Sequence, residues 1–473
     1  MFGTFTLILL GGVFVLQGLS YLFRHPLNRF PGPRLAKWTS WYRAYYDLVG
    51  QGAWVRQLEI LHARYGSIVR VGPNEEAAAM RSLLASYFSR RAVIRRETVI
   101  REKILKFISR LKSFHIEYAK PVSLNRALQS ASLDILTSVI FSQSFNVLDS
   151  PAFEHPFVYH RKTSVLNIWI TKYLPTPVLA AFTRLIPRID LAKDAVVKQC
   201  NIIRKEFEIT QSDSDDAQAD SNNTLFHYLL RRIQELLAKP ATSATTSARL
   251  EELLKPSRLI GEGINARFAG ADTVANACIV GVRHLLINSD ILKRLVEELD
   301  NAWPAESEPS YEELEKLPYL TAVIKESLRL SHGVVSPLGR VVGPGEAVIA
   351  GEQIPPGTNV GISATFVHLN PELFPDPAKF KPERWLDRAP RVENTTEINS
   401  DRYLVSFSRG PRACVGIHLA WCELYLIFGM LFRKLELNLV NVQDLHGPLC
   451  FDDFFTPIFT GNPPLVFVKE RES

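Results

Sequence analysis

The chain has 473 residues, 46% of them hydrophobic, which is enough apolar material for one large domain or for two or three average ones. Its formal net charge of +6 is mild for this length, and no basic cluster alternates with aromatic residues, which argues against a nucleic-acid-binding protein. Five scattered cysteines without a C-x-x-C pair argue against a disulfide framework and against zinc or iron–sulfur sites, and they favour a reducing compartment.

The first segment, Phe2 to Phe23, carries no charged residue and is typical of a membrane-spanning helix. A helix of about 22 residues extends about 33 Å, enough to cross a hydrocarbon core of about 30 Å. Basic residues follow from Arg24 onward, so the positive-inside rule places the rest of the chain in the cytoplasm. We expect residues 1–23 to be an uncleaved anchor, because a signal peptide is shorter and begins with basic residues.

Residues 24–37 are interpreted as a proline-rich hinge, since Phe30-Pro31-Gly32-Pro33 interrupts any helix there. The aromatic-rich stretch from Trp38 to Tyr46 follows. Its residue types favour a membrane interface, while ordinary packing accounts for them equally well.

The rest of the pattern predicts a mainly α protein with a small β region. Helices are expected at Trp54–Tyr65, from Arg91 to Gln143, at Ile260–Ile287, Ile291–Trp303 and Tyr319–Leu330, and from Ile417 to Leu431. A short strand is expected at Ser67–Val71, and the only clear sheet signal, short strands with Pro/Gly turns, lies around Val341–Val360.

The segment Ala269-Gly270-Ala271-Asp272-Thr273 lies in the middle of the long predicted helix. A glycine there costs about 1 kcal/mol relative to alanine, so it needs a packing or functional reason. One interpretation is a tolerated kink with locally capped side chains. The other is a groove in which Gly270 leaves room for a bound group beside the acid of Asp272 and the hydroxyl of Thr273.

Glu326 and Arg329 are three residues apart on the predicted helix 319–330 and therefore share one face of it. Taken alone, such a pair is best explained as an exposed ion pair worth a few tenths of a kcal/mol.

The most informative segment is Phe407–Gly416, which places Cys414 in a turn between two glycines and directly before an apolar helix. The glycines let the backbone approach a large flat cofactor, and the helix start stabilises negative charge on sulfur. Arg412 can meet a carboxylate on the rim of such a cofactor. The alternative, a free buried cysteine, is the usual state of a lone cysteine.

This segment resembles the cysteine-ligand loop of the cytochrome P450 family, Phe-x-x-Gly-x-Arg-x-Cys-x-Gly, at all five defined positions: Phe407, Gly410, Arg412, Cys414 and Gly416. The resemblance implies the cytochrome P450 fold, with residues 38–473 as a haem-thiolate catalytic domain after the hinge. It also implies haem b as cofactor, with Cys414 as the axial ligand of the iron.

Other motifs acquire expected roles from the same resemblance. Ala269–Thr273 is similar to the family's oxygen-binding motif, with Val274 in place of its second threonine, so Gly270 is expected to leave room over the iron. Asp272 and Thr273 are then the catalytic pair for proton delivery. Glu326, Arg329 and Arg384 are expected to form a buried structural cluster, in which removal of one member costs about 3–5 kcal/mol.

Two arginines are expected to bind the haem carboxylates by this resemblance. One is Arg412, and the other is Arg340, which follows the helix 319–330 by ten residues. His368 is a third polar neighbour in one interpretation and a packing histidine in the other.

One stretch departs from the family pattern. Only Val71 to Phe88 lies where the family has a strand, a helix, a substrate-covering loop and the start of another helix. We therefore expect a shortening near residues 75–88, which opens the roof of the site. It also removes an aromatic-x-x-x-Arg pair, because Arg81 is preceded four residues earlier by Ala77. Weak haem retention is expected, since a lost charge-assisted contact costs about 1.5–3 kcal/mol.

The resemblance implies a single-pass monooxygenase of the endoplasmic reticulum membrane that uses O2. Its electrons are expected from NADPH through a separate NADPH-cytochrome P450 reductase, with cytochrome b5 as a further donor, because the chain has no flavin domain or phosphate-cradling loop. A basic run is either a docking face for the reductase or a solvated helix face: Arg90, Arg91, Arg95, Arg96 and Arg101.

Similarity to filamentous-fungal members of the family implies an apolar small-molecule substrate from secondary metabolism, with a terpenoid favoured. Two alternatives remain open. One is a haem-thiolate isomerase or dehydratase that does not use O2, which the Asp272–Thr273 pair disfavours. The other is a haem-binding protein with little turnover because of the shortened segment.

Overall fold

The computed structural model describes residues 26–72, 84–141, 144–159, 224–238, 251–303, 308–345, 347–386, 400–440, 442–445 and 449–471, with Gly447 and a few residues between 169 and 205. The anchor expected at residues 1–23 lies outside these ranges. Across the described ranges, no helix combines the length and the apolar character needed to cross a bilayer.

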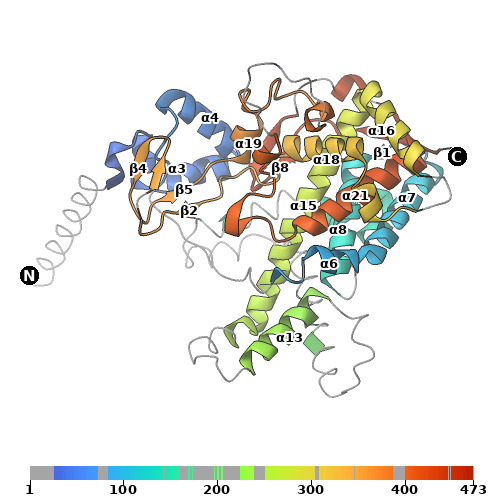
Figure 1. Ribbon diagram of the computed structural model, residues 1–473, viewed down its shortest axis with the longest axis horizontal. Coiled ribbons are helices and arrows are strands. Elements are labelled where there is room, and N and C mark those ends of the chain that lie inside the picture. Colours follow the sequence, from blue (N-terminus) through green and yellow to red (C-terminus); the bar gives the residue numbers. More distant parts are fainter. Residues whose placement is uncertain are drawn as a thin grey trace, which may run out of the picture.

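The long helix α15 (Pro256–Ile287) lies at the centre of the helical part of the molecule, and Figure 1 shows it running between the other large helices. It packs against three of them: α8 (Leu124–Ile140), α18 (Pro318–Ser331) and α21 (Ile417–Lys434). Helices α7 (Glu97–Tyr118) and α16 (Ser289–Ala302) pack against α8, α18 and α21 from outside. The sequence predicted most of these helices because their apolar residues recur with a helical period.

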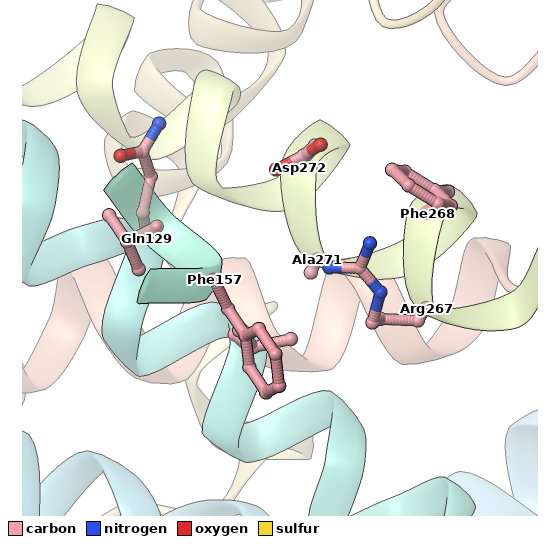
Figure 2. Close-up of a pocket in the computed structure, with 8 residues that line it drawn as sticks. Gln129, Phe157, Arg267, Phe268, Ala271 and Asp272 are labelled. Carbon is pink, nitrogen blue, oxygen red and sulfur yellow. The ribbon is translucent and has the colours of Figure 1, made fainter. Parts of the chain in front are cut away.

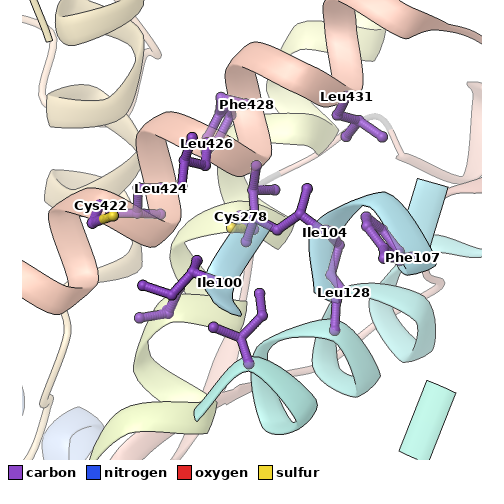
Figure 3. Packing of buried hydrophobic residues seen from close by; sticks show 14 of the residues in the cluster. Ile100, Ile104, Phe107, Leu128, Cys278, Cys422, Leu424, Leu426, Phe428 and Leu431 are labelled. Carbon is purple, nitrogen blue, oxygen red and sulfur yellow. The ribbon is translucent and has the colours of Figure 1, made fainter. Parts of the chain in front are cut away.

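One large hydrophobic core lies between these helices. Figure 3 shows Cys278 of α15 among side chains of α7, α8 and α21, such as Ile104, Leu128 and Phe428. Gly281 of α15 permits a close approach to two helices, because a Cβ atom there would lie 2.2 Å from Oγ of Ser327 in α18 and 2.5 Å from Cζ of Phe428 in α21. Helices α15, α18 and α21 therefore pack tightly enough to hold the elements at their ends in fixed positions.

The shorter helices surround this bundle. They are α2 (Arg34–Trp38), α3 (Trp41–Ala44), α4 (Trp54–Tyr65), α6 (Arg90–Ile94), α9 (Pro156–Tyr159), α13 (Leu225–Leu237), α17 (Tyr311–Leu314), α19 (Ala364–His368) and α20 (Ser400–Tyr403). A π-helical turn, Tyr45–Val49, follows α3 directly. The stretch expected to be helical from Arg91 to Gln143 forms α6, α7 and α8, and Pro121 with the short strand β1 (Val122–Ser123) separates α7 from α8.

Within the described ranges, the β structure consists of four small antiparallel sheets. The expected strands around Val341–Val360 form two of them: β2 (Arg340–Val341) pairs with β5 (Asn359–Val360), and β3 (Ala347–Ile349) with β4 (Glu352–Ile354). The C-terminal strands were not expected. In one C-terminal sheet, β9 (Leu465–Glu470) lies between β1 and β6 (Leu435–Leu439), and in the other β7 (Phe451–Phe454) pairs with β8 (Thr456–Phe459).

The strand expected at Ser67–Val71 is not formed in the structure, which corrects that prediction. A strand is stabilised by a ladder of hydrogen bonds to a neighbour. Among the described residues this segment makes one such backbone contact, from the Arg70 N–H to the carbonyl of Pro31 at 2.8 Å. That bond attaches the proline-rich hinge to the segment after α4.

The aromatic residues after the hinge lie in two different environments. Tyr42 and Tyr46 pack against Trp54 of α4, with ring centroids 6.2 and 6.0 Å from it. Trp41 and Tyr45, by contrast, are more than half exposed and lie four residues apart, on one side of consecutive helical turns. Packing therefore accounts for Tyr42 and Tyr46, while a membrane-interface role for Trp41 and Tyr45 stays a prediction.

Candidate active site

Cys414 lies in a loop, Val405–Gly416, that folds back on itself between α20 and α21. The Cys414 N–H donates to the carbonyl of Phe407 at 2.7 Å, and the Ser408 N–H donates to that of Val405 at 2.8 Å. Gly410 has a φ of +73°, a conformation that glycine adopts without strain. The loop places Cys414 two residues before Gly416, the N-cap of α21, and its side chain is exposed.

Among the cysteines, Cys414 is best placed to act as a thiolate ligand. Cys200, Cys278 and Cys422 are buried. Burial raises the pKa of all three thiols, that of Cys200 to about 12, so they stay protonated at neutral pH. Cys414 instead lies at a helix start, where the macrodipole favours negative charge.

Of the two arginines expected to bind haem carboxylates, one lies in this loop and the other contacts it from β2. Arg412 belongs to a short 3-10 turn, Gly410–Arg412, and is exposed. Arg340 begins β2, and its Nη2 donates to Oγ of Ser408 at 3.5 Å, so the fold brings it to the loop across 68 residues. Phe407 is half-buried, with its ring centroid 6.1 Å from that of Trp421. An exposed thiol, two cations and glycines at Gly410 and Gly416 fit a haem with two carboxylates.

The segment Ala269–Thr273 lies within α15, as expected, but its residues face different neighbours. The Thr273 hydroxyl donates to the carbonyl of Ala269 at 2.8 Å, and Ala269 is exposed on the same face of the helix. A Cβ atom at Gly270 would lie 2.5 Å from Cδ1 of Leu136 in α8. Gly270 thus faces α8 in this structure, and its expected place over the iron stays a prediction.

The physical reason is helix geometry, because successive residues are rotated by about 100°. A residue directed at α8 therefore does not share the face of Ala269 and Thr273. Ala269, which sequence reasoning did not select, is the small residue exposed on the Thr273 face. Its position four residues before Thr273 is the signal that identifies it.

Asp272 lines a small pocket between α8, α9 and α15 rather than the face of Thr273. Figure 2 shows it beside Arg267 and Phe268 of α15, with Gln129 of α8 and Phe157 of α9 across the pocket. The Arg267 guanidinium lies 4.1 Å from the centre of the Phe268 ring. The structure thus separates the two side chains expected to act as a pair, and it adds Gln129 and Arg267 to the surroundings of the acid.

Glu326, Arg329 and Arg384 are brought together in a buried cluster. The Glu326 carboxylate accepts hydrogen bonds from Nε and Nη2 of Arg329 at 2.9 and 2.8 Å, and from Nε of Arg384 at 3.1 Å. Trp385 Nε1 and the Lys381 N–H donate to the same carboxylate at 2.9 and 2.8 Å. Glu326 and Arg329 are fully buried, so the cluster joins α18 to the segment 381–385.

The basic run is largely engaged within the protein. Arg90 pairs with Glu315 at 2.6 Å, and Arg101 pairs with Glu97 at 2.5 Å. Arg96 lies 3.9 Å from the centre of the Tyr87 ring. Of this run only Arg91 and Arg95 are exposed, so most of its charge serves packing between α6, α7 and α17.

Comparisons with known proteins point to one family. The model of the cytochrome P450 family matches residues 47–459. Similar proteins include tryptophan 6-hydroxylase fscE of Fusarium equiseti, 32% identical over 94% of this chain and 93% of that protein. Another is cytochrome P450 monooxygenase sdnE of Sordaria araneosa, 32% identical over 96% of this chain and 95% of that protein.

Solved structures extend the comparison to the fold. The crystal structure of the haem domain of cytochrome P450DA superposes with a TM-score of 0.62. It covers 83% of this chain and 77% of that one, at 18% sequence identity, and therefore supports the fold alone.

The alignments also bear on the length of the chain. The alignments with the Fusarium and Sordaria proteins extend over 500 and 515 positions, which is more than the 473 residues of this chain. Both relatives therefore contain internal residues that have no counterpart here. The location of the shortening near residues 75–88 stays a prediction, because residues 73–83 lie outside the described ranges.

The packing role of Gly270 leads to a stability prediction. Gly270→Ala is expected to lower the free energy of unfolding by about 1–3 kcal/mol, because the added methyl group overlaps Leu136. Gly261→Ala, in the same helix, is the matched control: a Cβ atom there meets nothing within 4 Å, so helix propensity predicts a gain of up to about 1 kcal/mol. Urea unfolding measures both.

Truncating the partner side chain provides a second check. In a Leu136→Ala background the Gly270→Ala substitution should cost less, since the overlapping methyl groups are gone. An unchanged stability of Gly270→Ala, together with an altered haem spectrum, would return Gly270 to the side of the iron.

Proposed function

Since this chain belongs to the cytochrome P450 family and is a haem-thiolate monooxygenase, we propose that it inserts one oxygen atom from O2 into an apolar small molecule of fungal secondary metabolism. The similar proteins come from fungi such as Fusarium equiseti, Sordaria araneosa and Aspergillus terreus, which supports this substrate class. A terpenoid remains our preferred substrate within it.

The observation that carries the proposal is the loop Val405–Gly416. It holds an exposed Cys414 before α21 through the bond from its own N–H to the carbonyl of Phe407. When bound, haem b supplies the iron at which O2 is activated, and a thiolate ligand favours O–O cleavage. Arg340 and Arg412 would bind the haem carboxylates, which anchors the cofactor at the loop.

Protons reach the site through two groups in this proposal. The Thr273 hydroxyl donates its own proton to the carbonyl of Ala269, so its oxygen is left to accept a hydrogen bond on that exposed face. Asp272 collects protons in the pocket that it shares with Gln129 and Arg267, one helical face away. Electrons come from NADPH through a separate reductase, and cytochrome b5 is a further proposed donor.

The assignment of Cys414 is tested by substitution. Cys414→Ala is expected to abolish the thiolate-type spectrum of the reduced carbon monoxide complex while the protein still folds, because no other described thiol is presented on this loop. Cys422→Ala is the matched control, eight residues later in the buried core, and should retain that spectrum. Persistence of the spectrum in Cys414→Ala would assign the iron to another cysteine.

The role of Thr273 is tested by the coupling of NADPH consumption to product. Thr273→Ala should retain haem and NADPH consumption but lower product per NADPH several-fold, with the excess electrons appearing as peroxide or water. Thr321→Ala is the control. It removes a hydroxyl of α18 that is hydrogen-bonded to the Tyr425 hydroxyl of α21 at 2.8 Å, and it should leave coupling unchanged. Equal coupling in Thr273→Ala and the parent protein would contradict this role.

We also propose location in the endoplasmic reticulum membrane, with the catalytic domain in the cytoplasm. The support is the uncharged segment 2–23 and the exposed Trp41 and Tyr45 that follow the hinge. Deletion of residues 1–23 should move most of the protein from the membrane pellet to the supernatant. Resistance of the catalytic domain to protease in sealed microsomes would contradict this orientation.

One other function is favoured by a specific observation. The alignments show that the chain lacks internal residues of its relatives, which supports weak haem binding and little turnover. Measuring haem per chain in the purified protein distinguishes an active monooxygenase from a haem-binding protein with little turnover. Full haem occupancy with efficient coupling is expected only of the active monooxygenase.

A further inference from the structure

The loop that carries Cys414 is attached to the rest of the protein at its beginning by two hydrogen bonds. The Val405 N–H donates to Nε2 of His368 at 3.0 Å. The Ser406 hydroxyl donates to the carbonyl of Leu328 in α18 at 2.8 Å. The next residue, Phe407, accepts the hydrogen bond from the Cys414 N–H. The start of the loop is thus one residue away from the contact that holds the cysteine.

His368 continues this attachment toward the buried Glu326. It is the last residue of α19, and its carbonyl accepts a hydrogen bond from Nη1 of Arg329 at 2.8 Å. Arg329 is in turn bound by Glu326 at 2.8 Å. An unbroken series of contacts therefore runs from Glu326 through Arg329 and His368 to Val405, and from there along the loop to Cys414.

In the His368 ring, Nε2 is the atom that contacts the loop, and it acts as a hydrogen-bond acceptor. The side chain is fully buried and stacks on His332, with ring centroids 5.7 Å apart. Because Nε2 accepts a hydrogen bond, the proton of the neutral ring is on Nδ1. Within the described part of the chain Nδ1 has no hydrogen-bond partner. If the side chain served packing alone, an apolar residue would fill the space without leaving a buried polar atom unsatisfied.

The ring also remains neutral, as an acceptor must. Burial, with His332 and Arg329 nearby, holds the pKa of His368 well below its usual range. Burial similarly lowers the pKa of His332 to about 3. The Val405 contact is therefore present throughout the pH range in which the protein is studied.

We propose that His368 is a positioning residue for the iron ligand, and that its Nε2 fixes the start of the Cys414 loop and thereby the place of the sulfur. This rests on the proposed role of Cys414 as thiolate ligand. His368 touches neither haem nor substrate in this account; it acts through the backbone of Val405 to Phe407. Residues that contact a metal's ligand rather than the metal orient that ligand, and His368 does so here through the backbone of the loop.

Three variants test the proposal in the haem-loaded full chain. His368→Leu removes the acceptor and keeps an apolar side chain of moderate size, whereas His368→Gln retains an acceptor oxygen. His284→Leu is the matched control, since His284 is also a neutral, largely buried histidine, stacked on Phe380 at 4.8 Å. No hydrogen bond described in the structure joins the His284 side chain to the Cys414 loop.

Three readouts separate positioning from general stability. They are the thiolate-type fraction of the reduced carbon monoxide spectrum, the affinity for haem, and the urea unfolding midpoint. We expect His368→Leu to convert much of the spectrum to the non-thiolate type and to lower haem affinity about tenfold. His368→Gln should keep the thiolate-type spectrum, and His284→Leu should keep it even where its unfolding midpoint falls.

The outcomes distinguish this inference from the function on which it rests. A fully thiolate-type spectrum in His368→Leu, or an equal loss in His284→Leu at equal stability, overturns the positioning role. A parent protein without any thiolate-type spectrum overturns the proposed ligand itself. Loss of the spectrum in both His368 variants would assign the effect to ring packing and would also overturn the role of the acceptor atom.

Discussion

The buried carboxylate of Glu326 is the interaction on which the region around Cys414 depends. A fully buried charge is tolerated only when it is paired and hydrogen-bonded. Glu326 meets this requirement with donors from Arg329, Arg384 and Trp385, which come from two distant parts of the chain. Satisfying one carboxylate therefore fixes α18 against the segment 381–385, and through Arg329 it fixes α19 as well.

The position of the cysteine follows from this arrangement. The loop Val405–Gly416 has few side chains buried in the core, so its shape comes from backbone contacts within it and from attachments to its neighbours. Its start is bound to α18 and α19, and its end continues into α21, which is packed in the core. Arg340 reaches the loop because β2 and β5 hold the chain after α18 alongside it.

Helix α15 shows how one motif serves several neighbours at once. The faces of Ala269 and Thr273, of Gly270, and of Asp272 are separated by the rotation of about 100° per residue. Gly270 allows α8 to approach closely, Thr273 lies on the exposed face, and Asp272 lines a pocket toward α9. The close contact with Leu136 therefore helps to determine the orientation in which the other two residues are presented.

The sequence by itself determined the family, the main helices such as α4 and α15, and the cysteine, because periodic apolar residues and the spacing around Cys414 are local properties of the chain. It did not determine the C-terminal strands or exclude a strand at Ser67–Val71, since pairing depends on a neighbour that local patterns do not specify. Tertiary structure alone decided that Gly270 faces Leu136, that Asp272 shares a pocket with Gln129 and Phe157, and that His368 bonds to Val405. The reason is that these contacts depend on the rotation and packing of whole helices against one another.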